Sequence, residues 1–555
     1  MGTRLTFPVN IHVLGAFGLF LAFSAFDSAV ASPDSLARSK PIARISSEAV
    51  DTSAALPDAT PGPAFGTIPT VTPPNGAELS TGTISAAAPI SQTLSSDDVL
   101  VAESLRELLA TSLTQQIRYK DDRAAVEAFY RNRGYSPIWI ANLKANERAK
   151  NAIAFLNGVD ADALDPADYP TPTSTSATPQ TLAEDEIKLT NSVLMFARQA
   201  RTGRVNFAKV SAAISYDLQL PDPAKILTAV VETTDMGKTL NSYSPQQPGY
   251  KALKAELARQ REAIKGAQKT VPFRSTTIDT IVANMERWRW LPRELGSNYV
   301  MVNIPDYTLR VVDHGKTKWS TRIVVGKPGE MATPLLSETM KSITINPTWS
   351  VPPSIIRNEY LPALREDPDA LSRVGLKVER NSDGSIRVYQ PPGERNALGR
   401  IRFNFPNKFL VYQHDTPNKE LFAKNERAFS HGCMRVQYPE QYAEVLTSIS
   451  QPTDGFTAER VRNLFGRGER NIGLNNPIPV HVTYQTAFVD DTGKLQIRPD
   501  IYGRDAQVLK LLRNGHRPTD VPIARNDNAN SRRAISIFPR QQESGLSGFF
   551  RQFGN

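Results

Sequence analysis

Residues 430–435 read Ser430-His431-Gly432-Cys433-Met434-Arg435, and Cys433 is the only cysteine among the 555 residues of the chain. It therefore has no partner for an intrachain disulfide. Of the six histidines, His431 lies two residues before the cysteine and His414 lies sixteen residues before Ser430. A free thiol has a pKa of about 8.5 and reacts as the thiolate, so a neighbouring imidazole is its usual activator. Cys433 and His414 are therefore a candidate nucleophile and base.

Two other interpretations stay open on spacing alone. A single free cysteine is often a small apolar residue that fills the core. Cys433, His431 and His414 are also zinc-ligand types, and three such ligands plus water would make a catalytic zinc site. The paired ligand spacings typical of zinc sites are missing from the sequence, and the motif is similar to that of a metal-free family, so we expect no metal and no cofactor.

The motif and its upstream histidine resemble the signature of the L,D-transpeptidases (YkuD-type catalytic domain), in which a histidine and a spacer precede Ser-His-Gly-Cys. The resemblance covers roughly residues 278–504. It is closest to the large Gram-negative subgroup that carries an N-terminal scaffold domain and a capping insertion. Besides the motif, the segments that carry it are residues 284–293, 346–352, 396–400 and 414–417.

The resemblance implies an acyl transfer on peptidoglycan stem peptides. Cys433 would attack the carbonyl of the third residue, a diamino acid, of a tetrapeptide stem and release D-alanine. The amine of a second stem would then take the acyl group to form a 3-3 cross-link, with the amine of an outer-membrane protein or lipoprotein as another candidate acceptor. His414 would be the base. In the family the group that orients this histidine is often a nearby main-chain carbonyl, so its orientation is assigned to Asp415, and no role is claimed for the Asp415 carboxylate. Two alternatives remain, a cysteine L,D-carboxypeptidase or endopeptidase that uses water, and a non-catalytic wall-binding scaffold.

The other candidate site residues follow from the needs of this reaction. The backbone amides of Gly432 and Cys433 are candidate oxyanion donors, and we expect glycine there because a close backbone approach leaves no room for a Cβ. Ser430 and His431 are expected to shape the site, with direct proton transfer by His431 as the alternative. Arg435 is either a clamp for a substrate carboxylate or a support for the loop.

Two aromatic residues complete the candidate site. Tyr412 and Trp349 are predicted to form the wall of a substrate groove.

The N-terminus predicts export. Arg4 supplies positive charge, residues 13–26 are mostly apolar, and Ala29-Val30-Ala31 is a small-residue cleavage site. We expect residues 1–31 to be a cleaved signal peptide and the mature protein to be periplasmic. An uncleaved anchor is the alternative, although fourteen residues are fewer than the roughly 20 that a spanning helix needs.

Export bears on the cysteine and on the net charge. An unpaired thiol is at risk of oxidation in an oxidising compartment, so its presence favours a chemical use. The net charge of +9, from 65 basic and 56 acidic residues, suits anionic wall peptides or lipid head groups. The sequence contains no nucleic-acid-binding motif, so we expect no nucleic acid partner. The oligomeric state is not predicted.

The composition changes along the chain and predicts an α+β multidomain protein. Residues 32–94 are rich in Pro, Thr, Ser and Ala and predict a disordered tether. Residues 95–270 predict a helical scaffold domain. Residues 275–510 predict a β-rich domain, with a mainly helical insertion at about 351–400. The resemblance implies that this domain is the L,D-transpeptidase catalytic domain and that the insertion is its capping insertion. Residues 511–555 predict a disordered basic tail.

The expected elements are as follows. Helices are predicted at 123–131, 147–156, 182–200, 250–263 and 278–288, after a first helix with Ser96 as its N-cap. Strands are predicted at 299–304, 307–312, 319–325, 342–345, 401–403 and 409–413, and a closing hairpin at 480–489 and 495–497, with His481 as a packed strand residue.

Overall fold

The structure is a computed structural model, and it describes residues 95–173, 178–266, 276–352, 355–380 and 386–514. The predicted signal peptide and tether, and the tail beyond residue 514, lie outside these ranges. All described residues belong to one compact unit, Ser85–Asn555. Within the described ranges, no helix has both the length and the apolar character needed to cross a bilayer.

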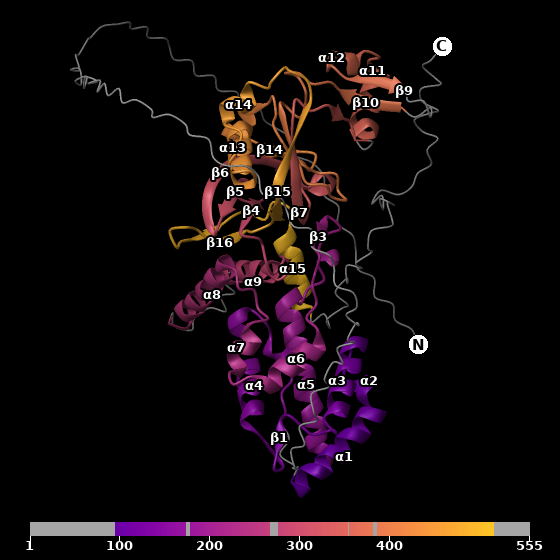
Figure 1. Ribbon diagram of the computed structural model, residues 1–555, viewed down its shortest axis with the longest axis vertical. Coiled ribbons are helices and arrows are strands. Elements are labelled where there is room, and N and C mark those ends of the chain that lie inside the picture. Colours follow the sequence, from indigo (N-terminus) through magenta and orange to yellow (C-terminus); the bar gives the residue numbers. More distant parts are fainter. Residues whose placement is uncertain (1–94, 174–177, 267–275, 353–354, 381–385, 515–555) are drawn as a thin grey trace, which may run out of the picture. The chain divides into compact units, whose positions relative to one another are not determined.

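The first part of the described chain is helical, as predicted (Figure 1). Its helices are α1 (Ser96–Thr111), α2 (Leu113–Gln116), α3 (Lys120–Asn132), α4 (Glu147–Asn157), α5 (Pro179–Thr202), α6 (Pro223–Glu232), α7 (Met236–Asn241) and α8 (Pro248–Gly266), with a small hairpin of β1 (Ile140–Ala141) and β2 (Lys144–Ala145).

Helix α5 is the centre of this helical part, because most of its side chains are buried and it contacts α1, α4 and α6. Glu186, in the middle of α5, accepts hydrogen bonds from Ile138 N at 2.5 Å, Trp139 N at 3.0 Å and Tyr130 Oη at 2.8 Å. Burial raises the pKa of the Glu186 carboxyl to about 7. This one carboxyl group therefore ties α3 and the segment before β1 to the central helix.

The prediction misplaced the N-cap of α1 and missed two helices. The side chain that caps α1 is Ser95, not Ser96: its Oγ accepts from Asp98 N at 3.2 Å. Helices α6 and α7 were not predicted, because neither has a long apolar repeat. Each instead begins after a capping aspartate, Asp222, which accepts from Ala224 N at 2.9 Å, and Asp235, which accepts from Lys238 N at 2.8 Å.

The second part is built on a large mixed sheet. Its strands are β3 (Ile214–Ser215), β4 (Asn298–Asn303), β5 (Thr308–Asp313), β6 (Lys316–Gly326), β7 (Leu335–Ile345), β11 (Ile401–Asn404), β12 (Gln413–His414), β13 (Ala428–Ser430), β14 (Met434–Val436) and β15 (Arg470–Thr483). Around the sheet lie α9 (Thr276–Trp288), α13 (Pro439–Ser450), α14 (Ala458–Arg462) and α15 (Arg504–Arg513).

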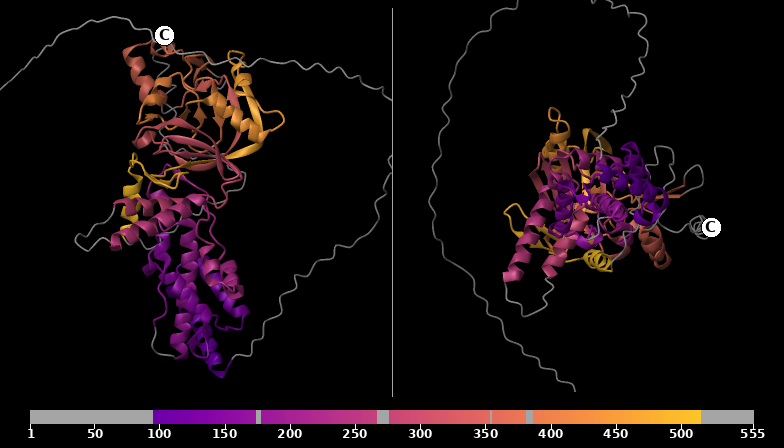
Figure 2. Two further views of the ribbon diagram at one scale, coloured as in Figure 1. Left: turned by 90° about the vertical axis from the view of Figure 1, so that its left-hand side faces the viewer. Right: turned by 90° about the horizontal axis from the view of Figure 1, so that it is seen from below.

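The order of the strands brings distant segments together. The path β11-β12-β14-β6-β5-β4-β15-β7 closes on itself, because β11 also pairs with β7. Strand β15 lies between β4, which it joins in parallel, and β7, which it joins antiparallel (Figures 1 and 2). Strand β3 comes from the helical part and pairs in parallel with the start of β7. The α+β architecture is thus confirmed.

Two strand predictions were wrong. Residues 409–412 do not form a strand, and β12 has only two residues. The side chain of Asn407 holds this segment as a loop, since its Oδ1 accepts from Phe409 N and its Nδ2 donates to Val411 O, and Leu410 has a φ of +57°. The closing hairpin joins β16 (Ala487–Val489) to β17 (Leu495–Ile497), whereas residues 480–483 belong to β15.

The insertion has its own small core and its own sheet (Figure 1). Its elements are β8 (Trp349–Ser350), the π-helical turn η5 (Ile356–Tyr360), α11 (Leu361–Glu366), α12 (Ala370–Arg373), β9 (Lys377–Arg380) and β10 (Ile386–Gln390), and its sheet has the order β8-β10-β9. The insertion is therefore mixed rather than mainly helical. Besides its short helices, it contains a hairpin of β9 and β10 that pairs over four residues.

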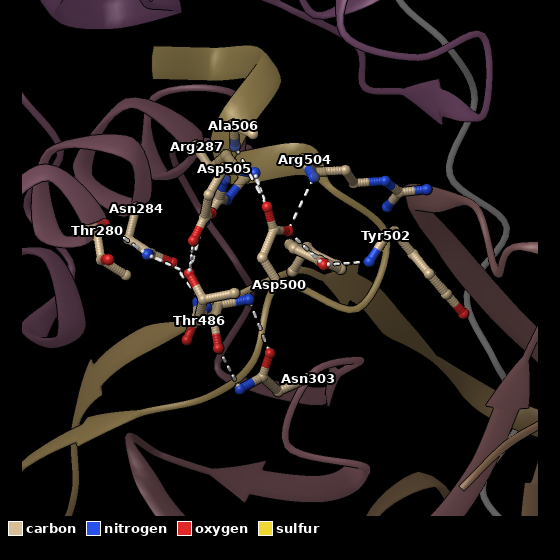
Figure 3. Close-up of polar contacts among 12 residues, drawn as sticks. Thr280, Asn284, Arg287, Asn303, Thr486, Asp500, Tyr502, Arg504, Asp505 and Ala506 are labelled. Atoms are coloured by element: carbon tan, nitrogen blue, oxygen red, sulfur yellow. Dashed lines mark hydrogen bonds and ion pairs between the residues drawn. The ribbon is translucent and has the colours of Figure 1, made fainter. Parts of the chain in front are cut away.

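Helix α9 is bonded to the C-terminal segment (Figure 3). Asn284 Nδ2 donates to Thr486 Oγ1 at 2.7 Å, and Asn284 Oδ1 accepts from Thr486 N at 3.0 Å. Arg287 Nη2 donates to Asp505 Oδ1 at 2.5 Å. Asp505 belongs to α15, which continues to Arg513, so the first residues assigned to the disordered tail are helical.

The opposite side of α9 is bonded to the helical part. Glu286 accepts from Val205 N at 2.7 Å, and Arg289, just after α9, donates to Glu286 Oε2 at 3.2 Å and to the Asp162 carbonyl. Arg289 and Glu286 are 0% and 1% exposed at their side chains. The polar residues of 284–293 are thus used to join segments of the chain.

Candidate active site

The pairing of β12 with β14 decides where the candidate catalytic residues lie. The two strands are parallel, with Gln413 opposite Met434 and His414 opposite Arg435. Tyr412 and Cys433 come directly before these strands, and Met434 N donates to Tyr412 O at 3.1 Å. Because side chains alternate between the two faces of a sheet, the side chains of Tyr412, His414, Cys433 and Arg435 share one face. The register therefore brings the thiol and the imidazole to the same surface.

His414 is buried, with 5% of its surface exposed, and its ring is held through one nitrogen. Nδ1 donates to the carbonyl oxygen of Asp415 at 2.5 Å. Burial, followed by the charge of Arg435, lowers the pKa of His414 to about 3, although hydrogen bonding to the main chain of Asp415 and Leu398 opposes this shift. The imidazole is therefore neutral at physiological pH and able to accept a proton.

Cys433 is partly exposed as a residue, but burial of its thiol raises the pKa to about 11. Hydrogen bonding from the Tyr412 main chain and hydroxyl, and the charges of Arg435 and Arg402, partly offset this effect. The resting thiol is thus protonated. Within the described part of the chain, no hydrogen bond joins His414 to Cys433, although the register places both side chains on one face.

The loop before β14 is held by Ser430, which is 3% exposed. Its Oγ donates to Cys433 O at 2.5 Å and accepts from Gly432 N at 3.2 Å. The Gly432 amide, one of the two predicted oxyanion donors, is therefore already bonded within the loop. Among the hydrogen bonds of the described residues, none uses the Cys433 amide, which leaves that N–H as the available donor.

The backbone conformation supplies a reason for glycine at position 432. A Cβ there would meet no atom closer than Val411 Cγ1 at 3.6 Å, which is ordinary contact, but Gly432 has a φ of +110°. Side chains with a Cβ rarely adopt that backbone conformation. The close approach lies instead at Gly326, where a Cβ would come within 3.0 Å of Gly432 Cα and 1.9 Å of Met331 O.

Asp415 connects the base to the insertion. Its carbonyl accepts from His414, while its carboxylate accepts from Arg400 N at 2.8 Å and from Lys419 Nζ. Gly399, with a φ of +62°, lies against the same carboxylate, since a Cβ there would be 2.3 Å from Asp415 Oδ2. The end of the insertion and the position of the imidazole are therefore linked through one residue.

Two arginines flank the thiol. Arg435, on β14, is half-buried, and its Nε is buried without a hydrogen-bond partner. Arg402, on β11, lies opposite His414 in the antiparallel pair, and its guanidinium is 5.6 Å from the centroid of the Tyr412 ring. Arg402 was missed by the sequence analysis, because only the register of β11 and β12 places it on this face.

The aromatic candidates and His431 lie around the same region. Tyr412 packs edge-on against His414, with ring centroids 5.7 Å apart. Trp349 is buried in the core of the insertion, against which Tyr412 also packs. Burial raises the pKa of Tyr412, and a hydrogen bond with the Trp349 side chain partly offsets this rise. His431 is exposed between β13 and β14. His481 is a packed residue of β15, as predicted, with 3% exposure.

Family models match both parts of the chain. Residues 124–257 match the scaffold domain, and residues 297–462 match the YkuD L,D-transpeptidase catalytic domain. The chain therefore contains a scaffold domain followed by a YkuD-type L,D-transpeptidase catalytic domain, which confirms the resemblance seen in the sequence.

Individual proteins give a similar result. The chain is 25% identical over 452 residues to a Haemophilus influenzae protein named "Putative L,D-transpeptidase", covering 76% of this chain and 86% of the relative. Among solved structures, Mycobacterium tuberculosis L,D-transpeptidase 1 is 14% identical, covers 34% of this chain and 61% of that one, and has a TM-score of 0.15. The catalytic domain of the E. faecium L,D-transpeptidase is 16% identical, covers 34% of this chain and 96% of that one, and has a TM-score of 0.16. TM-scores this low support no structural argument.

Proposed function

We propose that the protein is a periplasmic L,D-transpeptidase that forms 3-3 cross-links in peptidoglycan. The observation that carries this proposal is the register of β12 and β14, which lays the lone thiol and a buried neutral imidazole on one face of the catalytic domain. The proposal includes cleavage of residues 1–31 as a signal peptide, and stem peptides as the substrates.

In the first half-reaction, the sulfur of Cys433 attacks the carbonyl carbon of the third stem residue. Because the thiol is protonated at rest, its proton passes to Nε2 of His414 as the carbon–sulfur bond forms. The Asp415 carbonyl keeps the other nitrogen protonated and so fixes the tautomer. The Cys433 amide would face the oxyanion of the tetrahedral intermediate.

The intermediate then collapses to a thioester. The carbon–nitrogen bond to D-alanine breaks, and the departing amine takes the proton from His414. An acceptor amine next attacks the thioester, gives its surplus proton to His414, and restores the thiol. The bond count stays constant, since one amide is exchanged for another and no ATP or metal is needed.

The two arginines fit an anionic donor. Among the ion pairs of the described residues, none includes Arg435 or Arg402. Burial lowers the pKa of Arg435, and the charges of Cys433 and Glu420 oppose this shift. A carboxylate at the end of the stem would supply the missing negative charge, which supports the role of Arg435 as a carboxylate clamp and adds Arg402 to it.

The test of this function has two parts. Intact-protein mass should show one equivalent of a carbapenem on Cys433 in the wild type and none on the Cys433→Ala variant; stoichiometric labelling of the variant would exclude Cys433 as the nucleophile. Incubation of the mature protein with disaccharide-tetrapeptides should release D-alanine and give dimers joined between third residues. If D-alanine appears with tripeptide monomers alone, even at high acceptor concentration, the enzyme is an L,D-carboxypeptidase instead.

A further inference from the structure

The carbonyl group before the nucleophile is held by a threonine outside the signature motif. Thr333 lies between β6 and β7 and is 0% exposed. Its Oγ1 donates to Gly432 O at 2.9 Å and accepts from Gly326 N at 2.8 Å. The hydroxyl thus joins the end of β6 to the loop that carries Cys433.

The C-terminal segment holds Thr333 in turn. Tyr502 Oη accepts from Thr333 N at 3.3 Å and donates to Gly326 O at 2.6 Å. Arg504 Nη2 donates to Thr333 O at 3.3 Å, and its guanidinium lies 5.0 Å from the centroid of the Tyr502 ring. The N–H, the hydroxyl and the carbonyl of Thr333 therefore all have partners, so its position is strongly defined.

Asp500 fixes the two residues that contact Thr333 (Figure 3). Its Oδ1 accepts from Arg504 N at 2.8 Å and from Tyr484 Oη at 2.7 Å, and its Oδ2 accepts from Asp505 N at 2.9 Å. Tyr484 Oη also accepts from Tyr502 N at 2.8 Å. This framework lies beyond residues 297–462, the range that matches the catalytic domain.

Because the peptide group is planar, the hydrogen bond from Thr333 to the Gly432 carbonyl also affects the direction of the Cys433 N–H. The Gly432 carbonyl and the Cys433 N–H belong to one planar trans peptide, so they point in opposite directions. A hydrogen bond that fixes the carbonyl toward Thr333 also fixes the direction of the Cys433 N–H. That amide is the oxyanion donor left available, because the Gly432 amide is bonded to Ser430.

We propose that Thr333 is a positioning residue for acyl transfer, which orients the Cys433 amide toward the oxyanion through the Gly432 carbonyl. Tyr502 and Arg504 keep Thr333 in place, so the C-terminal segment is part of the framework of the active site. This inference rests on the proposed function, since an oxyanion forms only if Cys433 is acylated.

The first measurement uses the Thr333→Val variant, which removes the hydroxyl and keeps a similar shape. Loss of one oxyanion donor costs about 10²- to 10³-fold in kcat. Misorientation of a donor that is still present should cost less, about 10- to 100-fold in carbapenem acylation and in kcat for D-alanine release. KM should stay within about twofold, because the interaction belongs to the transition state. The Thr333→Ser variant, which keeps the hydroxyl, should recover most of the rate.

A second reagent separates positioning from general damage to the loop. Iodoacetamide alkylates a thiol by displacement at a saturated carbon, so no oxyanion forms. The Thr333→Val variant should therefore be alkylated at Cys433 at the wild-type rate while its acylation is slow. Thr447→Val is the matched control, because this buried threonine of α13 donates to Ala443 O at 3.0 Å and accepts from Phe456 N at 3.0 Å. It should lose stability without a slower acylation.

Two results would overturn the inference: wild-type acylation by Thr333→Val, or equal losses of acylation and alkylation. If Thr333→Val does not fold, Tyr502→Phe decides the question, with acylation expected to fall about threefold to tenfold and an unchanged rate counting against it. If the wild type itself is not acylated at Cys433, the proposed function fails and this inference with it. If the wild type is acylated and the variants match it, only the inference fails.

Discussion

Replacement of His414 by glutamine should turn a pH-independent acylation into one that follows the ionisation of Cys433. Burial lowers the pKa of His414 to about 3 and raises that of Cys433 to about 11. Between these values the pair starts as a neutral imidazole and a neutral thiol, and the imidazole takes the proton as the sulfur attacks. The wild-type rate of carbapenem acylation should therefore be flat from about pH 4 to about pH 9.

In the His414→Gln variant no imidazole takes the thiol proton, so only the fraction of Cys433 that is already ionised can react. With a pKa of about 11, the thiolate fraction at pH 7 is about 10⁻⁴, and it rises about tenfold per pH unit. General-base assistance is typically worth about 10²- to 10⁴-fold. The His414→Gln variant should thus be slower by about that factor at pH 7, and should approach the wild type as the pH rises toward 10.

Acylation followed by intact-protein mass from pH 5 to pH 10 measures both profiles. His481→Gln is the control, because this second buried histidine bonds to Ser337 Oγ at 3.0 Å and Leu295 O at 2.9 Å, in β15 rather than β12. Its profile should remain flat. A His414→Gln variant with the wild-type rate, or with a flat profile, would remove the imidazole from the mechanism.

Three further predictions concern residues around the site and between the domains. Gly399→Ala should lower kcat at least tenfold, because the added Cβ would displace the carboxylate of Asp415. Gly393→Ala is the control and should match the wild type, because no atom lies within 4 Å of the added Cβ and the φ of Gly393 is not positive. Equal kcat values for the two variants would contradict the link between the insertion and His414. Arg402→Met should raise KM for a tetrapeptide about fivefold to tenfold with little change in kcat, if the guanidinium binds the donor carboxylate; steady-state D-alanine release checks it, and an unchanged KM rejects it. Arg289→Met should cost about 3–5 kcal/mol in urea unfolding because it leaves a buried carboxylate unpaired, whereas Arg131→Met, which breaks an exposed pair, should cost less than about 1 kcal/mol.

The sequence alone led to the proposed reactive pair, Cys433 and His414, because a lone cysteine and a motif can be recognised without knowledge of the fold. The residues that support the pair could not be found that way. Thr333 lies 99 residues from Gly432 along the chain, and Arg402 reaches the site only through the register of β11 with β12. Neither position belongs to a local pattern, since their neighbours in space come from other strands.

The segment before β12 shows why composition alone does not predict a strand. Residues 409–412 are apolar and aromatic, which is typical of a strand, yet one asparagine side chain bonds the backbone of this segment and holds it as a loop. Side-chain bonds to the backbone compete with strand pairing. Apolar composition therefore predicted that the segment lies near the sheet, but not its backbone conformation.

Strand β3 belongs to the scaffold domain by sequence, but it is part of the sheet of the catalytic domain. Ile214 and Ser215 lie within the range matched by the scaffold domain, yet they pair with Leu335 and Leu336 at the start of β7. A catalytic domain cut free of residues 95–270 would lose the strand that pairs with Leu335 and Leu336, two residues that are now 1% exposed. Unpaired strand edges can pair with other chains, so we expect copies of the separated domain to associate with one another. In the full chain, strand β3 of the scaffold domain occupies this edge.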